Sequence, residues 1–113
     1  MAHTGSELQT LAYQHTEIRR DGLKLTLPDG TLAGSALDML TALRHYHHDL
    51  ALPLSSGLKA LSANPAGLCG LHTDIGYLQQ GALANMLLLN TELDIQRCWL
   101  HGAQINNNNR IQL

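Results

Sequence analysis

Leucine alternates with polar residues over a short stretch in the first third of the chain. Leucines at positions 23, 25 and 27 are separated by Lys24 and Thr26, and this period of two is typical of a strand with one buried face. Arg20-Asp21-Gly22 has the composition of a tight turn. Residues 12–27 therefore predict a hairpin or two short strands.

Two amphipathic helices follow in the pattern. From Ala36 to Leu50, apolar residues recur every three or four positions, which predicts a helix with one apolar stripe. Pro53 ends this helix and can begin the next, whose leucines at 54, 58 and 61 again share a face. Asn64-Pro65 is expected to break the second helix, and residues 66–71 could add a single turn.

The last third of the chain is typical of strands. Met86 to Leu89 is a continuous apolar run of strand length. Residues 90–92 predict a turn, and a second strand is expected from Leu93 to Trp99, ended by Gly102. Residues 106–113 begin with four asparagines and predict a disordered polar tail. The order of strands, helices and strands in 113 residues indicates an α/β chain of one domain at most.

Turn-forming residues lead directly into the first predicted helix. Pro28-Asp29-Gly30 predicts a turn, and Gly34-Ser35 places a flexible backbone just before the helix. Ser35 and Asp38 are three residues apart, as in a capping pair. A helix N-terminus behind a glycine offers free N–H groups and the positive end of the helix dipole. We therefore expect this place to favour an anionic or oxygen-rich ligand.

Charge and composition narrow the classes of partner. The net charge is −2, whereas nucleic acid and anionic membranes call for a basic patch, so neither is expected as a partner. The chain has no apolar run of the ~20 residues that span a bilayer and no signal peptide is expected. Two cysteines, Cys69 and Cys98, are too few for a disulfide framework. These features predict a cytoplasmic protein.

Seven histidines invite a metal interpretation. His45, His47 and His48 are the densest group, and His45 and His48 share a helix face. A stable zinc site needs at least three protein ligands with oriented partners, and neither HExxH nor CxxC occurs. We therefore predict solvated or partly packed histidines and no metal ligands.

The other reactive side chains form no catalytic constellation by spacing. Cys69 lies near His72 and Asp74, but its apolar neighbours predict a small core residue rather than a nucleophile. Arg19-Arg20 could reach a phosphate, although an exposed hairpin pair is the expected role. The carboxylates are scattered. No catalytic residue is predicted in this chain.

Several segments together resemble a known enzyme family. They are Asp29–Leu37, Ala60–Leu71, the series Gly76, Leu78, Gly81 and Ala84, and finally Trp99 with Gly102. This series resembles the C-terminal part of the N-acetylglucosamine-6-phosphate deacetylases, which are metal-dependent amidohydrolases, and N-acetylgalactosamine-6-phosphate deacetylases are similar to about the same degree. The chain departs from the family pattern at Gly67, Ala82 and Asn85, where Arg, Lys and Asp are usual.

The resemblance implies a fold and a partial site. Residues 1–72 would be the C-terminal part of a (β/α)8 barrel, with a strand hairpin and two helices, and residues 73–105 would be strands of a small β-sandwich. Leu32, Ala33 and Gly34 would contact the substrate, an N-acetylhexosamine 6-phosphate. The family's divalent metal, zinc or similar, and its catalytic Asp would belong to preceding sequence, because this chain would start one or two residues beyond that Asp.

Three functions remain open from the sequence. The chain could be a truncated sugar-phosphate deacetylase that is inactive alone. It could be one half of a split enzyme, completed by a separate N-terminal chain. It could also be a small non-enzymatic binding or interaction domain that folds as a monomer. Association with another chain, as a complementing N-terminal chain or in a homo-oligomer, is a further possibility. The resemblance does not separate glucosamine from galactosamine substrates.

Overall fold

The computed structural model describes residues 8–14 and 16–106. The chain forms two compact units, which divide between Ala42 and Leu43. The tail predicted to be disordered lies outside the described residues from position 107 onward. Strands, helices and strands follow one another in the predicted order.

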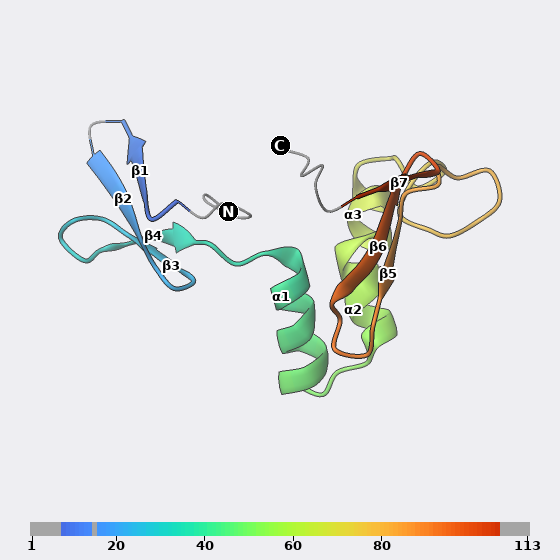
Figure 1. Ribbon diagram of the computed structural model, residues 1–113, viewed down its shortest axis with the longest axis horizontal. Helices are drawn as coiled ribbons and strands as arrows, with labels where there is room; N and C mark the ends of the chain where they lie inside the picture. The colour runs from blue at the N-terminus through green and yellow to red at the C-terminus, as the bar shows by residue number, and fades with distance from the viewer. Residues whose placement is uncertain (1–7, 15, 107–113) are drawn as a thin grey trace. The chain divides into compact units, whose positions relative to one another are not determined.

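The first unit is a four-stranded antiparallel sheet in the order β1-β2-β3-β4 (Figure 1). Its strands are β1 (Thr10–Tyr13), β2 (Thr16–Asp21), β3 (Lys24–Thr26) and β4 (Leu32–Ser35). The predicted hairpin is confirmed as β2 and β3, joined through Gly22 in a left-handed conformation. The sheet is larger than predicted, because β4 was expected to be a loop before a helix.

A small apolar cluster holds this sheet together. Ile18, Leu25 and Ala36 are buried, and Leu11 and Leu27 pack against them. Leu25 is the centre of the cluster, with only 1 % of its surface exposed. The alternation of leucines therefore identified the buried face correctly at its central position.

The turn at Pro28-Asp29-Gly30 is confirmed and has a defined geometry. Gly30 N donates to Leu27 O at 2.9 Å, and Leu27 N donates to Thr31 O at 2.8 Å. Gly30 has φ +87°, a conformation that glycine adopts without a Cβ penalty. This is a three-residue hairpin loop with glycine at its left-handed position.

The first helix begins later than the sequence predicted. α1 spans Met39–Arg44, and Asp38 Oδ1 accepts a hydrogen bond from Thr41 N at 2.7 Å. Asp38 is thus the capping residue. Ser35 instead accepts from Leu37 N within a local turn, and it pairs with Lys24 in the sheet. The predicted Ser35–Asp38 capping pair is wrong, and Gly34-Ser35 is strand rather than helix N-terminus.

The helical segment of the second unit changes type after Arg44. Residues His45–Asp49 form a π-helix, η1, closed by Leu50 N donating to His45 O at 3.0 Å. The wider turn rotates the predicted apolar stripe away from its expected direction. Leu43 is buried, whereas Leu50 at the end of the same stripe is exposed.

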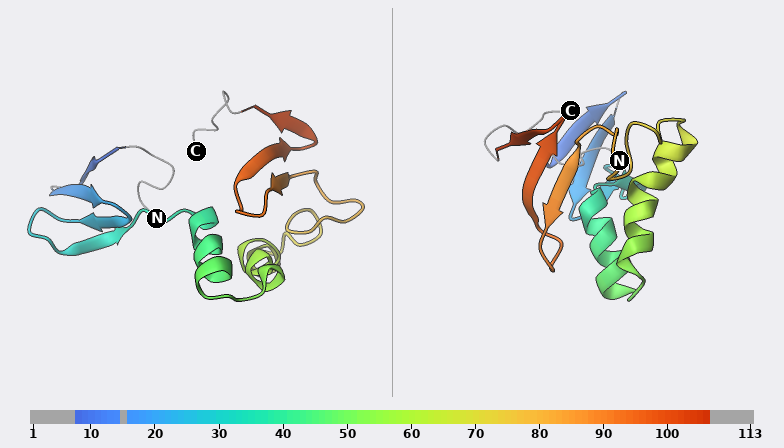
Figure 2. Two further views of the ribbon diagram at one scale, coloured as in Figure 1. Left: turned by 60° about the horizontal axis from the view of Figure 1, so that its bottom comes forward. Right: turned by 90° about the vertical axis from the view of Figure 1, so that its right-hand side faces the viewer.

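Two further helices follow Pro53. α2 spans Leu54–Leu61 as predicted, but the break lies at Ser62 rather than at Asn64-Pro65. α3 spans Ala63–Leu68 and carries Pro65 in its first turn, where the missing proline N–H has no helical partner to lose. The second view of Figure 2 shows α2 beside the preceding helical segment.

A glycine permits this close packing. Gly57 of α2 is buried, and a Cβ at that position would lie 2.8 Å from Leu43 Cδ1 and 2.9 Å from Tyr46 Cδ1. Tyr46 is held in place by a 2.7 Å hydrogen bond between its hydroxyl and Ser56 Oγ. The two helical segments therefore meet at a distance that only glycine allows.

The second unit ends in a three-stranded antiparallel sheet with the order β5-β6-β7 (Figure 1). β5 (Met86–Leu89) matches the prediction, β6 spans Ile95–Leu100 and β7 spans Ala103–Ile105. β7 was not predicted. Leu93 was expected in the strand, but it lies in the turn with φ +64° and is buried.

Candidate functional site

The candidate substrate segment, Leu32 to Gly34, lies on an edge strand. β4 pairs with β3 on one side and is the last strand in the order of the first sheet. All four of its residues are exposed, and Leu32 has 68 % of its surface open to solvent. Other residues of the first unit therefore leave this segment open to a ligand.

A bulge at Ala33 shapes this segment. Leu32 opposes Thr26 and Gly34 opposes Leu25, so Ala33 is the extra residue between two adjacent partners on β3. Bulges bend the strand that carries them and change the direction of its side chains. Here the bend lies within the three residues that the sequence resemblance connects with substrate.

A hydrogen-bonded turn fixes the start of the segment. Asp29 Oδ1 accepts from Thr31 N at 2.9 Å. The Thr31 hydroxyl and then the Thr31 N–H stabilise the ionised carboxylate, which lowers the pKa of Asp29 below its ordinary value. Leu32, Ala33 and Gly34 carry no titratable side chain. The segment can therefore position a ligand through its backbone, but it cannot transfer a proton.

The histidines of η1 are engaged by their own unit. His45 Nδ1 lies 2.5 Å from Asp49 Oδ2, one helical turn away. His47 Nδ1 lies 2.9 Å from Leu52 O. Each of these two rings thus uses one nitrogen on a local partner, as expected for solvated or partly packed histidines.

No metal-ligand group is found among the described residues: residues 8–14 and 16–106 contain no cluster of three or more His, Cys, Asp or Glu side chains with suitable geometry. The divalent metal implied by the resemblance therefore has no fitting ligand set in this part of the chain.

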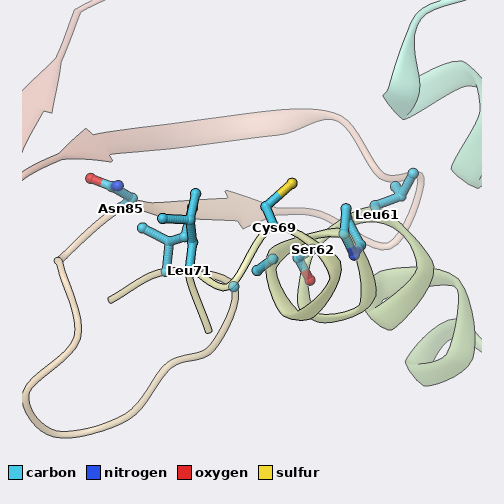
Figure 3. A pocket seen from close by; sticks show the side chains of 9 residues that line it. Leu61, Ser62, Cys69, Leu71 and Asn85 are labelled. Atoms are coloured by element: carbon cyan, nitrogen blue, oxygen red, sulfur yellow. The ribbon is translucent and has the colours of Figure 1, made fainter. Parts of the chain in front are cut away.

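Cys69 borders an apolar hollow of about 390 Å³ in the second unit (Figure 3). The prediction that Cys69 is a core residue is wrong, because its side chain is exposed. The backbone N–H of Cys69 donates to Pro65 O, and the backbone of Asp74 bonds to Leu71 and Leu83. The lining is mostly apolar, and its residues are Leu61, Ser62, Pro65, Ala66, Cys69, Leu71, Ile75, Gly76 and Asn85.

The sequence patterns did not predict this hollow. Gly76, with φ +93°, brings its loop so close that a Cβ there would lie 2.7 Å from Ala66 Cβ. A run of small residues in a helix opposite a loop glycine would have been the signal for such close packing. The spacing of these residues does not identify a ligand.

Asn85 and its neighbour Ala84 bind the turn that joins β6 and β7. Its Oδ1 accepts from His101 N at 2.9 Å, and Gly102 N donates to Ala84 O at the same distance. These bonds connect the start of β5 to the turn between β6 and β7. An amide oxygen accepts here as a carboxylate oxygen would.

The arginine pair of the first hairpin is engaged locally. Arg19 Nε lies 3.7 Å from Glu17 Oε1 in an exposed ion pair. Arg20 Nε donates to Gly22 O at 3.0 Å. The expected role of an exposed hairpin pair agrees with these contacts.

A search of the described helices for a bilayer-spanning segment found none of sufficient length and hydropathy.

Comparisons of sequence give a consistent family. No family model matches the chain. N-acetylglucosamine-6-phosphate deacetylase from Homo sapiens is 33% identical over 102 residues, which are 89% of this chain and 24% of the human protein. N-acetylgalactosamine-6-phosphate deacetylase from Shewanella sp. (strain ANA-3) is 28% identical over 102 residues, which are 90% of this chain and 26% of that protein. The chain is homologous to a segment of these deacetylases. It spans about a quarter of the length of the curated relatives it matches.

Solved deacetylases share the fold of the chain. The N-acetylglucosamine-6-phosphate deacetylase of Pasteurella multocida matches 94% of this chain with a TM-score of 0.85 at 20% identity. The enzyme of Mycobacterium smegmatis, solved in complex with N-acetyl-D-glucosamine-6-phosphate, matches 92% with a TM-score of 0.73 at 25% identity. In each case the chain covers 28% of the solved protein. The succession of an antiparallel sheet, helices and a second antiparallel sheet along the chain is thus found in solved deacetylases.

Proposed function

We propose that the chain supplies one wall of the active site of an N-acetylhexosamine-6-phosphate deacetylase, an enzyme that hydrolyses the acetamido group of a sugar phosphate. The observation that carries this proposal is the homology to deacetylases over nearly nine tenths of the chain. The solved relative that holds N-acetyl-D-glucosamine-6-phosphate supports the substrate class.

In this proposal, Leu32, Ala33 and Gly34 contact the sugar. Their exposure on an edge strand leaves backbone N–H and C=O groups for a polar ligand. The bulge at Ala33 supports the assignment, since bulges are common beside active sites. The metal ligands and the catalytic acid would come from polypeptide equivalent to the rest of the relatives, so the 113 residues alone would give no turnover.

We further assign residues 1–72 to the barrel and residues 73–105 to the sandwich of such an enzyme. The boundary at residue 72 lies in the connection between α3 and β5, which supports a division there. The first sheet is antiparallel, whereas the strands of a (β/α)8 barrel are parallel, so only the helical part of residues 1–72 supports the barrel assignment. The compact units divide elsewhere, between Ala42 and Leu43.

We also propose a cytoplasmic location for the protein. Cys69 and Cys98 are free thiols in the structure, which is typical of proteins in the reducing cytoplasm.

A chimera tests the function directly. The matching segment of the human deacetylase is replaced by this chain, zinc is supplied, and acetate release is measured with both N-acetylhexosamine 6-phosphates. We expect hydrolysis by the chimera and none by the 113-residue chain. A folded chimera that releases acetate from neither sugar would contradict the proposal.

A charge placed on the segment tests its role in the chimera. Ala33→Glu puts a carboxylate beside the proposed ligand, and we expect kcat/KM to fall at least ~10-fold, a loss of about 1.4 kcal/mol of transition-state stabilisation. Ala12→Glu is the matched control, since Ala12 is an exposed alanine on the opposite edge strand of the same sheet. Equal activity in both variants would remove the segment from the site.

A further inference from the structure

Asp-Gly occurs twice in the first unit, each time in an exposed turn of the sheet. Asp21-Gly22 begins the turn between β2 and β3, where Asp21 is paired with Lys24 across the hairpin. Asp29-Gly30 lies in the loop between β3 and β4. An aspartate followed by glycine is open to attack by the next backbone nitrogen, because glycine has no Cβ to obstruct a close approach. The two turns can therefore be compared as sites of one chemistry.

This chemistry rearranges the backbone without a change in mass. The glycine nitrogen attacks Cγ of the neutral aspartic acid, a C–N bond forms, and the Cγ–OH bond breaks with release of water. Water then adds to one of the two carbonyls of the cyclic imide. Cleavage at Cγ restores aspartate, whereas cleavage at the main-chain carbonyl gives isoaspartate, in which the chain runs through Cβ and Cγ. One water leaves and one returns, so no other reactant is required.

Both reacting groups are engaged in hydrogen bonds at Asp29-Gly30. Gly30 N donates to Leu27 O at 2.9 Å, and Asp29 Oδ1 accepts from Thr31 N at 2.9 Å. The Thr31 hydroxyl and then its N–H also lower the pKa of Asp29, so that less of the neutral acid is present. Ring closure in this turn must first break these contacts.

The reacting groups at Asp21-Gly22 are open by comparison. Both residues are exposed. Within residues 8–14 and 16–106, we find no hydrogen bond or ion pair of the Asp21 carboxylate and no acceptor for Gly22 N–H. Arg20 Nε donates to Gly22 O at 3.0 Å, but that oxygen takes no part in ring closure. The nucleophile and the carboxyl of this turn can therefore react without losing a hydrogen bond.

We propose that Asp21 is a site of spontaneous isoaspartate formation, and that the hydrogen bonds of the second turn protect Asp29 from the same modification. The inference does not depend on the proposed function. Isoaspartate adds one atom to the backbone at the start of a tight turn, and turn geometry sets the register of a hairpin. Leu25, the buried centre of the apolar cluster, pairs with Arg20 in this hairpin. Modification of Asp21 would therefore disturb the core of the first unit.

Peptide mapping of the 113-residue chain tests the proposal. The chain is incubated in mildly acidic buffer with and without urea, and electron-transfer fragmentation measures isoaspartate at each position. Each rate in the native chain is divided by the rate of the same site in urea, which removes the effect of local sequence. We expect this ratio to be at least ~10-fold greater at Asp21 than at Asp29, because hydrogen bonds must break at the protected turn. Equal ratios, or a greater ratio at Asp29, would overturn the proposal.

A substitution at Thr31 tests the protection separately. Thr31→Val removes the hydroxyl that stabilises the Asp29 carboxylate, and we expect isomerisation at Asp29 to rise ~5-fold with no change at Asp21. Thr31→Ser keeps the hydroxyl and should keep the slow rate. Thr26→Val is the matched control, since it makes the same change on β3, outside both turns. An unchanged rate at Asp29 in Thr31→Val would contradict the protective role of the turn.

A last variant confirms the assignment of the reactive site. In Asp21→Glu the longer side chain does not form the same ring, so isoaspartate should disappear from position 21 while the rate at Asp29 stays as it was. Isoaspartate that accumulates in the native chain at Asp29 alone would contradict the proposal.

Discussion

At the scale of single residues, Gly57 is a position where an added methyl group would disturb the packing of two helical segments. Gly57→Ala would normally stabilise a helix, but here the added Cβ meets Leu43 and a tyrosine ring held by Ser56. We expect the free energy of unfolding to fall by about 1–3 kcal/mol, as for other overpacked sites. Urea denaturation of the purified chain measures the change.

Gly67→Ala is the matched control for that substitution. Gly67 also lies in a helix, α3, and a Cβ there would have no atom within 4 Å. We expect the variant to be stabilised by about 0.5–1 kcal/mol, because glycine loses more backbone entropy than alanine. If both substitutions change the free energy of unfolding in the same direction, close packing at Gly57 does not explain the effect of Gly57→Ala.

Asp29 should report the integrity of the turn Pro28-Asp29-Gly30 through its titration. Its pKa is lowered in the folded chain because Thr31 stabilises the carboxylate, first through its hydroxyl and then through its N–H. The carboxylate therefore contributes stability above the pKa of an unfolded aspartate. That contribution disappears as the pH falls through the lowered folded pKa.

An NMR titration of the Asp29 carboxyl tests this. We expect Thr31→Val to raise the pKa toward the ordinary aspartate value, since the hydroxyl is lost, and Thr31→Ser to keep it low. A pKa that is equal in the valine and serine variants would show that the hydroxyl has no part in the shift.

At the scale of elements, Arg44 connects a helix to a strand turn. Its guanidinium donates to Glu92 O at 3.2 Å, to Leu93 O at 3.0 Å and to Asp94 Oδ1 at 2.7 Å. These contacts hold Leu93 in its left-handed conformation. We expect Arg44→Ala to cost roughly 1–2 kcal/mol, because two charge-assisted bonds to backbone carbonyls are lost. Faster hydrogen exchange at Leu93 and Asp94 would accompany it.

Asp94→Asn separates the ion pair from the backbone bonds. The pair is partly exposed, so removing its charge should cost less than about 1 kcal/mol. If Asp94→Asn lowers the free energy of unfolding as much as Arg44→Ala does, the ion pair, and not the hydrogen bonds to the Glu92 and Leu93 carbonyls, holds the helix to the turn.

The periodicity of apolar residues predicted the elements that are determined by a few neighbouring residues. The hairpin β2–β3, the helix α2 and the strand β5 each follow from periodicity within a few residues. β4 was missed because Leu-Ala-Gly-Ser has little strand propensity and forms through its pairing with β3. The turn at Leu93 is contacted by Arg44, which lies 48 to 50 positions away from it in sequence, and periodicity does not show such contacts. The π-helix was not predicted either, because the apolar pattern does not distinguish it from an α-helix.

At the scale of the whole molecule, the exposure of apolar side chains is the main departure from an ordinary small domain. Among the described residues, Leu68 and Leu78 are the most exposed leucines, and exposed apolar surface binds ANS. We expect the chain to bind the dye ANS. The double variant Leu68→Glu with Leu78→Glu should bind less dye and keep its free energy of unfolding within about 0.5 kcal/mol. Unchanged dye binding would place the exposed surface elsewhere.

The candidate site came from family resemblance rather than from pattern. Leu32, Ala33 and Gly34 have no chemical group that spacing could single out. The local prediction of an anion site at a helix N-terminus was wrong, because the helix starts at Met39. The Pro28-Asp29-Gly30 turn was predictable, since its geometry is set by the residue types themselves.

The bulge at Ala33 bears on insertions and deletions among related proteins. Without Ala33, Leu32 and Gly34 would be adjacent and would oppose Thr26 and Leu25, which are adjacent as well. The ladder would then be regular, so folding alone gives no reason to retain the extra residue. Lineages that keep three residues here when they deacetylate sugars, and drop one when they do not, would show that the ligand maintains the length of this strand.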